Sequence, residues 1–182
     1  MHVDIRHLDA DAAGRRLDDL AALLHACVHA GASIGFILPC PLDEARAFWS
    51  GKVLPSVAGG RQDLFVAMEQ DRLCGTVLLD TDTPANQPHR AEIRKLLVHP
   101  DMRRRGIARL LMAAAERRAA EHRRSLLTLD TRTGDSAEPL YASLGYETAG
   151  IIPGYCLDPH DPHDPMFDAT TIMYKQLPPG AR

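Results

Sequence analysis

Hydrophobic positions in the first sixty residues are spaced for short elements separated by glycine and proline. Apolar side chains predict a first strand over residues 3–8 and, at helical spacing, a helix that ends at Gly31. An apolar linker follows over residues 32–38, and Pro41 with two acidic residues after it predicts the start of a second short helix. We interpret residues 51–60 as the end of that helix and a loop.

The rest of the chain alternates strand-like and helix-like patterns. Short apolar runs bounded by turn residues predict six strands, at residues 64–68, 73–79, 91–99, 125–130, 146–152 and 170–177. The first two of these are expected to form a hairpin. One helix is expected to start at Ile107 and another to span residues 136–144, ending at Gly145. This order indicates an α/β (α+β) fold with a mixed central sheet flanked by helices, and residues 1–182 contain no evident domain linker.

Composition and charge narrow the class of protein. The 182 residues are 45% hydrophobic and 25% charged, which is typical of a globular domain that buries a sizeable core. A net charge of −3 gives no electrostatic footprint for nucleic acid or for a membrane surface. No segment is typical of a signal peptide or a membrane span. The four cysteines lack metal-site spacing and are expected to be reduced thiols, which favours a cytoplasmic location.

The most informative segment is a turn with three arginines and a glycine between the strand at 91–99 and the following helix. The first amides of a helix have no partner within the helix and lie at its positive end, so they can bind phosphate. The small residues in this turn would let phosphates approach the backbone. The predicted phosphate-binding residues are Arg103, Arg104, Arg105, Gly106, Ile107 and Ala108. A solvated surface turn is the alternative, because the glycine-rich signatures of nucleotide sites are absent.

Two motifs resemble one known family. The pattern Arg103-x-x-Gly106-x-Ala108 at a helix start resembles the acetyl-CoA signature of the GNAT N-acetyltransferase superfamily. Residues 137–146, a helix with Tyr141 followed by Gly-Tyr, resemble a second element of that family, in the expected order and separation. The resemblance implies a mostly antiparallel sheet whose two central strands, at 91–99 and 125–130, splay apart around acetyl-CoA. It implies no metal and leaves a homodimer open.

Further stretches resemble a member of this family that acetylates a β-lactam amino-acid toxin. These are residues 31–36, 89–98, 127–131 and 153–156. The resulting prediction is an acetyl-CoA-dependent N-acetyltransferase that acts on the amine of a small molecule, with an amino-acid-like toxin or antimetabolite as one candidate acceptor. A protein or peptide N-acetyltransferase is the first alternative. A regulatory module that binds CoA without turnover is the second.

The resemblance also assigns roles along the predicted cleft. The backbone of Leu96, Leu97 and Val98 would hold the pantetheine arm, and a bulge near residues 97–98 would leave one amide free for the thioester oxygen. Amine acetylation requires a base, because only the neutral amine attacks. The candidate bases are Glu92 and Asp130.

Each candidate base also has a structural interpretation. Glu92 would pair with Arg90 or Arg94, and Asp130 would cap a turn. Tyr141 matches the family position for a proton donor to the thiolate, and its ordinary pKa of ~10 keeps it protonated at neutral pH. Its alternative is core packing.

Other positions bear on the acceptor and on metal. Many GNAT proteins carry an asparagine where Gly134 stands here, which puts the cofactor contacts of the 136–144 helix in doubt. The acceptor is expected against Ser33, Phe36 and Tyr155, with Trp49 as a further candidate. Packing in the core or in a loop is the alternative for each of the three aromatic residues. The acids and histidines between Asp158 and Asp164 resemble a metal cluster in composition only, and they are expected to face solvent.

Overall fold

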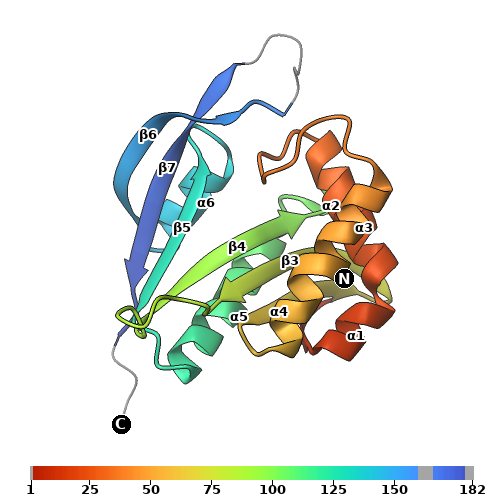
Figure 1. The fold of residues 1–182 in the computed structure, drawn as a ribbon, viewed down its shortest axis with the longest axis horizontal. Helices are drawn as coiled ribbons and strands as arrows, with labels where there is room; N and C mark the ends of the chain where they lie inside the picture. The colour runs from red at the N-terminus through yellow and green to blue at the C-terminus, as the bar shows by residue number, and fades with distance from the viewer. Residues whose placement is uncertain (1, 160–165, 179–182) are drawn as a thin grey trace.

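A computed structural model describes residues 2–159 and 166–178 as a seven-stranded sheet with helices on its faces (Figure 1). This confirms the predicted α/β class. The strands are β1 (Val3–Leu8), β2 (Gln62–Glu69), β3 (Arg72–Asp80), β4 (Arg90–Val98), β5 (Leu126–Arg132), β6 (Glu147–Leu157) and β7 (Phe167–Gln176). The helical elements are α1 (Ala10–Arg15), α2 (Leu17–His29), α3 (Leu42–Phe48), the π-helix η1 (Trp49–Val53), α4 (Leu54–Ala58), the 3₁₀-helix η2 (Pro100–Met102), α5 (Ile107–Glu121) and α6 (Ala137–Ser143).

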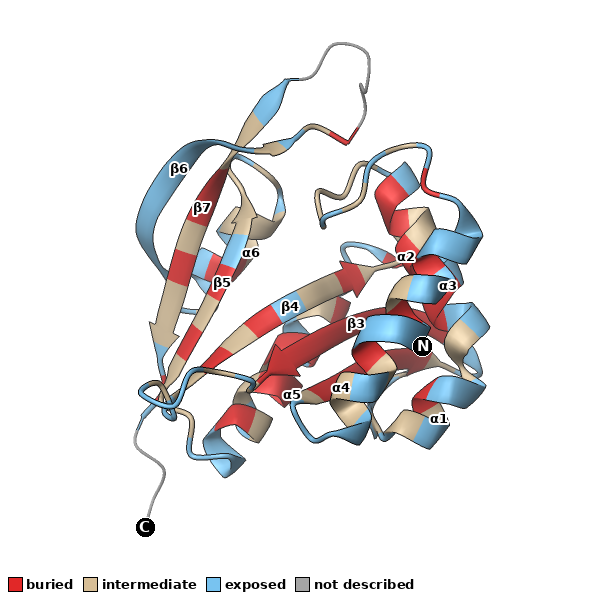
Figure 2. Cartoon of the chain, in the orientation of Figure 1, coloured by how far each residue is buried: buried red, intermediate tan, exposed pale blue. Residues whose placement is uncertain are grey.

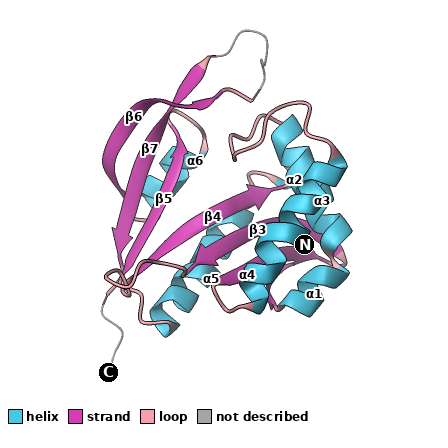
Figure 3. Cartoon of the chain, viewed as in Figure 1, coloured by secondary structure: helices cyan, strands magenta, loops and turns pink. Residues whose placement is uncertain are grey.

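The sheet divides into two parts between its central strands. The strand order is β1-β2-β3-β4-β5-β7-β6, and every neighbouring pair is antiparallel except β4 and β5. Within the described chain these two parallel strands pair only at Arg90–Leu126, Ala91–Leu127 and Glu92–Thr128. Beyond these pairs the strands diverge (Figure 3), which confirms the predicted splay of the central strands.

Helices cover both faces of the part of the sheet formed by β1 to β4. On one face, α5 buries Ile107 and Leu111 against β3 and β4. On the other face, α2 and η1 bury Leu24 and Trp49 over the same strands. Strand β3 is buried along nearly its whole length (Figure 2), as is typical of a strand enclosed by two layers.

Residues 51–60 differ from the prediction. The prediction there is the end of the second helix and a loop, but η1 and α4 continue the helical path of α3 as far as Ala58. The cause is tertiary packing: Trp49 and Val53 are four residues apart and both are buried in the core. Pro55 falls in the first turn of α4, where a helix needs no amide donor.

Strand β6 forms one edge of the sheet and is exposed along nearly its whole length. Its exposed apolar side chains include Ile151 and Ile152. The homodimer stays a prediction.

In the described residues no helix has the length and hydropathy needed to cross a membrane.

Candidate active site

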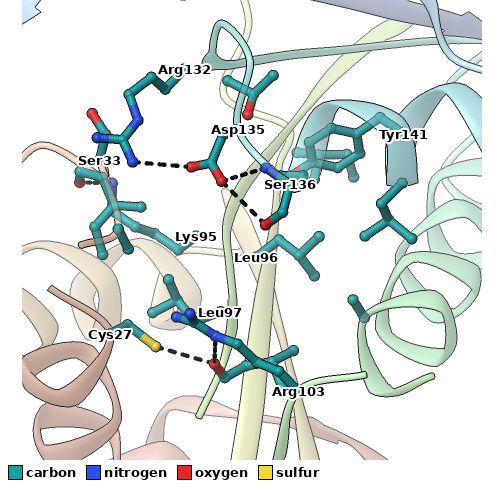
Figure 4. Close-up of a pocket in the computed structure, with 18 of the residues that line it drawn as sticks. Cys27, Ser33, Lys95, Leu96, Leu97, Arg103, Arg132, Asp135, Ser136 and Tyr141 are labelled. Atoms are coloured by element: carbon teal, nitrogen blue, oxygen red, sulfur yellow. Dashed lines mark hydrogen bonds and ion pairs between the residues drawn. The ribbon is translucent and has the colours of Figure 1, made fainter. Parts of the chain in front are cut away.

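A cleft of about 1010 Å³ lies where β4 and β5 diverge, at the upper end of the roughly 300–1,000 Å³ usual for ligand sites. Its walls also include the start of α5, the α6 helix and the segment after α2 (Figure 4). Twelve residues predicted for the site line it: Ser33, Leu96, Leu97, Val98, Arg103, Arg104, Gly106, Ile107, Ala108, Asp130, Tyr141 and Tyr155. Among the described residues, Glu92, Arg105 and Phe36 are predicted site residues that do not line it.

The start of α5 has the geometry needed to bind an anion. Gly106 precedes the helix with a φ of 78°, a left-handed conformation that glycine adopts without strain. No described side chain caps the helix here, so its first amides are available to a ligand. Arg104 also has a positive φ of 61°, and it lines the cleft beside Ala108. These residues fit the pyrophosphate of acetyl-CoA.

The three arginines of the turn have different surroundings. Arg103 lines the cleft, and its Nε donates to the carbonyl of Val98 at 3.3 Å. The side chain of Arg105 instead turns to Glu69 on β2 and pairs with its carboxylate. This pairing holds the pKa of Glu69 below its usual value. Arg105 therefore does not line the cleft, because the carboxylate of Glu69 binds its side chain, and phosphate binding by Arg105 stays a prediction.

Strand β4 carries a bulge at the cleft. Thr76 lies opposite Leu97 and Leu78 lies opposite Arg94, so β4 has one residue more than β3 over this stretch. Lys95 lies within it at a φ of 50°, and its carbonyl accepts from the hydroxyl of Thr76 at 3.1 Å. The bulge was expected near residues 97–98 and lies closer to the start of the strand, because Lys95 adopts the left-handed conformation.

The backbone of β4 beyond the bulge is accessible from the cleft. Leu96 and Val98 line the cleft, and within the described chain neither pairs with β5. A strand edge without a partner offers amides and carbonyls to any extended chain that contains amide groups. The pantetheine arm of acetyl-CoA is such a chain, so this edge fits the predicted binding mode.

The two candidate bases lie in different settings. Asp130 is exposed and lines the cleft, and its carboxylate forms no hydrogen bond or ion pair with the described residues. Glu92 is partly exposed and lies 3.7 Å from Arg90 and 3.8 Å from Arg94. Both ion pairs anticipated as its structural alternative are therefore present. Their catalytic roles stay predictions, with Asp130 the better placed.

Tyr141 on α6 is almost fully buried and lines the cleft. Its ring packs edge-on against Tyr146, with ring centroids 5.9 Å apart. Burial raises the pKa of the Tyr141 hydroxyl well above its ordinary value, and the negative charges of Asp130 and Asp135 add to the effect. The hydroxyl therefore stays protonated and can donate a hydrogen bond.

At the acceptor end of the cleft, Ser33 and Tyr155 lie where they were expected. Phe36 does not: it packs edge-on against Phe48, with ring centroids 5.4 Å apart, beside the core under α2. Trp49 is fully buried in the same core. Both aromatic side chains are held there by burial of apolar surface, which no motif in the linker indicates.

Several lining residues were not assigned to the site from the sequence. Lys95 donates from Nζ to the carbonyl of Ile34 at 2.9 Å. Arg132 donates to the carbonyl of Gly31 at 3.0 Å. Cys27, Asp135 and Ser136 also line the cleft (Figure 4). Asp135 and Ser136 adjoin Gly134, at the position that departs from the family pattern, and this was the only sequence signal for any of them.

The described residues hold no group of three or more potential metal ligands. The expected solvent-facing segment from Asp158 to Asp164 lies outside the described residues from position 160 onward.

Comparisons with solved structures show the same fold in acetyltransferases. An N-acetyltransferase from Staphylococcus aureus Mu50 superposes with a TM-score of 0.77 at 16% identity, over 98% of this chain and 100% of its own. The yncA structure from Salmonella typhimurium, solved with its cofactor acetyl-CoA, gives 0.73 at 17% identity, over 97% and 94%. A ribosomal-protein-alanine N-acetyltransferase from Brucella melitensis gives 0.74 at 20% identity, over 96% and 99%.

The sequence itself matches a family model. Residues 39–146, more than half of the chain, match the model described as the Acetyltransferase (GNAT) family. The matched stretch includes β4, the turn before α5, β5 and α6, the elements that build most of the cleft. The chain therefore belongs to the GNAT family of acetyltransferases, which transfer the acetyl group of acetyl-CoA.

Proposed function

We propose that this protein transfers the acetyl group of acetyl-CoA to the amine of a small molecule. The observation that carries the proposal is the way the segment after α2, residues 31–38, is bonded to both diverging strands beside the cleft. Lys95 on β4 bonds the carbonyl of Ile34, and Arg132 on β5 bonds the carbonyl of Gly31. Leu38 also donates to the carbonyl of Pro159 at 3.0 Å. Cations from both diverging strands thus fix this segment across the opening.

A segment fixed in this way favours a small acceptor. A polypeptide acceptor needs an extended groove in which several residues lie on either side of the reacting amine. The bonded segment 31–38 narrows the space available for such a chain. The resemblance of residues 31–36 and 153–156 to the family member that acetylates a β-lactam amino-acid toxin supports the same conclusion and suggests an amino-acid-like acceptor.

The residues of the cleft supply the steps that amine acetylation needs. Asp130, with Glu92 as the second candidate, accepts a proton from the acceptor's ammonium, because only the neutral amine attacks. The amine nitrogen then bonds to the acetyl carbon as the carbon–sulfur bond breaks. Of the two protons that the ammonium loses, one goes to the carboxylate and one to the departing thiolate. Tyr141 donates a hydrogen bond to that thiolate, and the backbone beside the Lys95 bulge donates to the thioester oxygen.

The direct test measures CoA thiol release from acetyl-CoA with a panel of small amines and a panel of peptides, with mass spectrometry of the products. We expect release and an acetylated product with small amines. Asp130→Asn should lower kcat by about 100-fold or more, since general-base catalysis is typically worth 10²–10⁴, with little change in CoA affinity. The same measurement of kcat in Glu92→Gln tests whether Glu92, and not Asp130, is the general base.

The alternatives predict different outcomes. Acetylation of peptides but not of small amines would support the peptide acetyltransferase and contradict the proposal. Tight CoA binding without thiol release for any amine would support the regulatory module. If neither acid affects the rate at any pH, the assignment of the base is wrong.

A further inference from the structure

The acceptor end of the cleft presents two opposite charges that do not pair with each other. Asp130 lies on β5 and Lys95 on β4, and both side chains line the cleft. Their charges interact, because Asp130 raises the pKa of Lys95. Among the described residues, neither side chain comes within ion-pair distance of an opposite charge.

Arg94 and Arg132, the other cations of β4 and β5 that line the cleft, already have anionic partners. Arg132 has the carboxylates of Asp135 at 3.5 Å and Asp168 at 3.4 Å. Arg94 has Asp80 at 3.3 Å and Glu92 at 3.8 Å. Lys95 differs from both, because within the described residues its only hydrogen-bond acceptor is the carbonyl of Ile34. An ammonium has three donors, so two remain for a ligand.

The position of Lys95 is maintained by the fold. The bulge holds its backbone at a φ of 50°, an uncommon conformation for a residue with a β-carbon. Its side chain lies over the ring of Phe48, with Nζ 5.4 Å from the ring centroid. Figure 4 shows it on the same side of the cleft as Ser33. A strained backbone and an incompletely bonded ammonium in a cleft are features of a binding site.

We propose that Lys95 selects acceptors that carry a carboxylate, so that the acceptor is an amino acid whose ammonium faces Asp130 while its carboxylate binds Lys95. This inference rests on the proposed function, which it deepens by naming the class of acceptor. A simple cationic amine would satisfy Asp130 and be repelled by Lys95. A zwitterion satisfies both charges at once, and charge-assisted hydrogen bonds are the stronger ones.

The test compares amino acids with their α-carboxamides, which keep the amine and remove the negative charge. Because the two amines differ in basicity, the quantity compared is the ratio of kcat/KM values, acid over amide, in the wild type and in variants. Lys95→Met keeps the length of the side chain and removes its charge. It should lower that ratio at least tenfold, as expected for loss of a hydrogen bond to a charged group of roughly 1.5–3 kcal/mol. Lys95→Arg should restore most of the ratio.

Lys52→Met is the matched control. Lys52 is exposed on η1 and does not line the cleft, although its charge is close enough to affect Lys95. The control should leave the acid-to-amide ratio within about twofold of the wild type. Loss of the hydrogen bond to Ile34 in Lys95→Met would affect both acceptors equally, so it cancels in the ratio.

A second readout does not depend on turnover. Calorimetric titration of amino acids into the CoA-bound protein should show binding that Lys95→Met weakens at least tenfold. If the wild type acetylates amides as well as acids, or if Lys95→Met lowers both rates equally, the inference is wrong while the proposed function stands. If no amine is acetylated, the proposed function fails, and the calorimetric titration then tests the inference about Lys95 by itself. Equal binding of amino acids to the wild type and to Lys95→Met overturns that inference.

Discussion

Lys95 keeps a charge where burial makes charge unfavourable, and this makes it sensitive to pH. Burial, together with the positive charges of Arg94 and Lys52, lowers its pKa from 10.5 to about 8. Asp130 and Glu92 act in the opposite direction. The ammonium is therefore present below pH 8 and is lost as the pH rises through that value. An ordinary exposed lysine would keep its proton to about pH 10.

If Lys95 binds the carboxylate of the acceptor, this titration should appear in the kinetics. The ratio of kcat/KM for an amino acid to kcat/KM for its amide should fall as the pH rises through about 8. The ratio reports ionisation of the free enzyme and of the two free substrates. Lys95→Arg keeps its proton to above pH 10, so its ratio should show only the titration of the two substrate amines. Wild-type and Lys95→Arg ratios that follow the same pH profile from pH 7 to 10 would contradict the role of Lys95.

Tyr141 gives a second prediction at this scale. Tyr141→Phe removes one hydroxyl from a side chain that is otherwise well packed, so the fold and the CoA affinity should change little. The rate constant kcat should fall by about 10- to 100-fold, since the departing thiolate loses its hydrogen-bond donor. Tyr146→Phe is the control, because Tyr146 is a buried neighbour outside the cleft lining. Equal losses in both variants would indicate a packing effect.

Some of these residues could be assigned from the sequence and others could not. Tyr141 and Asp130 follow strong local patterns, and both line the cleft. Arg105 and Phe36 stand beside lining residues in the sequence, but each turns to a partner that is distant along the chain, Glu69 or Phe48. Lys95 could be assigned to the site only once the position of the bulge in β4 was known. Side-chain direction therefore depended on tertiary contacts that one sequence does not display.

At the scale of elements, the start of α5 depends on the conformation of one residue. Gly106 has a φ of 78°, and a β-carbon added there would meet no atom within 4 Å. Glycine is therefore needed for backbone freedom and for close approach of a ligand, and packing does not require it. Gly60, after α4, is similar in conformation and in open space, at a φ of 67°, but lies away from the cleft lining.

Alanine substitutions at Gly106 and Gly60 distinguish an effect on folding stability from an effect on CoA binding. Gly106→Ala and Gly60→Ala should each destabilise the fold by about 1–2 kcal/mol, the usual cost of a left-handed residue with a β-carbon. Only Gly106→Ala should also raise the Kd of CoA, by about tenfold, because its methyl group stands between the phosphates and the helix amides. Denaturant unfolding and calorimetry measure the two effects. A similar Kd in both variants would rule out phosphate binding at α5.

The bounds of a helix or strand could be predicted from the sequence where one of its faces is apolar and its ends carry residues typical of helix or strand ends. Strand β1 and the α5 helix start lie where they were predicted. Residues 51–60 were misassigned because Gly51 and Pro55 indicate a break, while burial of Trp49 and Val53 determines the outcome. A local preference of about 1 kcal/mol is smaller than the free energy gained by burying a tryptophan.

At the scale of the whole molecule, the cleft is also the weakest junction in the sheet. The part from β1 to β4 and the part from β5 to β7 share only three paired positions within the described chain. The segment 31–38 adds contacts across the junction through Lys95 and Arg132. A ligand that bonds β4, α5 and α6 together would therefore join the two parts and stabilise both.

Binding of CoA should raise the melting temperature and slow hydrogen exchange at defined positions. At a CoA concentration of 100 Kd, mass action stabilises by about 2.7 kcal/mol, or roughly 5–10 °C for a domain of this size. The amides of Leu96 and Val98 should become protected, because the pantetheine arm would pair with this free strand edge, whereas Leu97 already pairs with Thr76 of β3. Amides of β1, which pair with β2 in either state, provide the internal control. A rise in melting temperature without protection of Leu96 and Val98 would place CoA elsewhere on the molecule, since a ligand outside the cleft leaves that edge open to solvent.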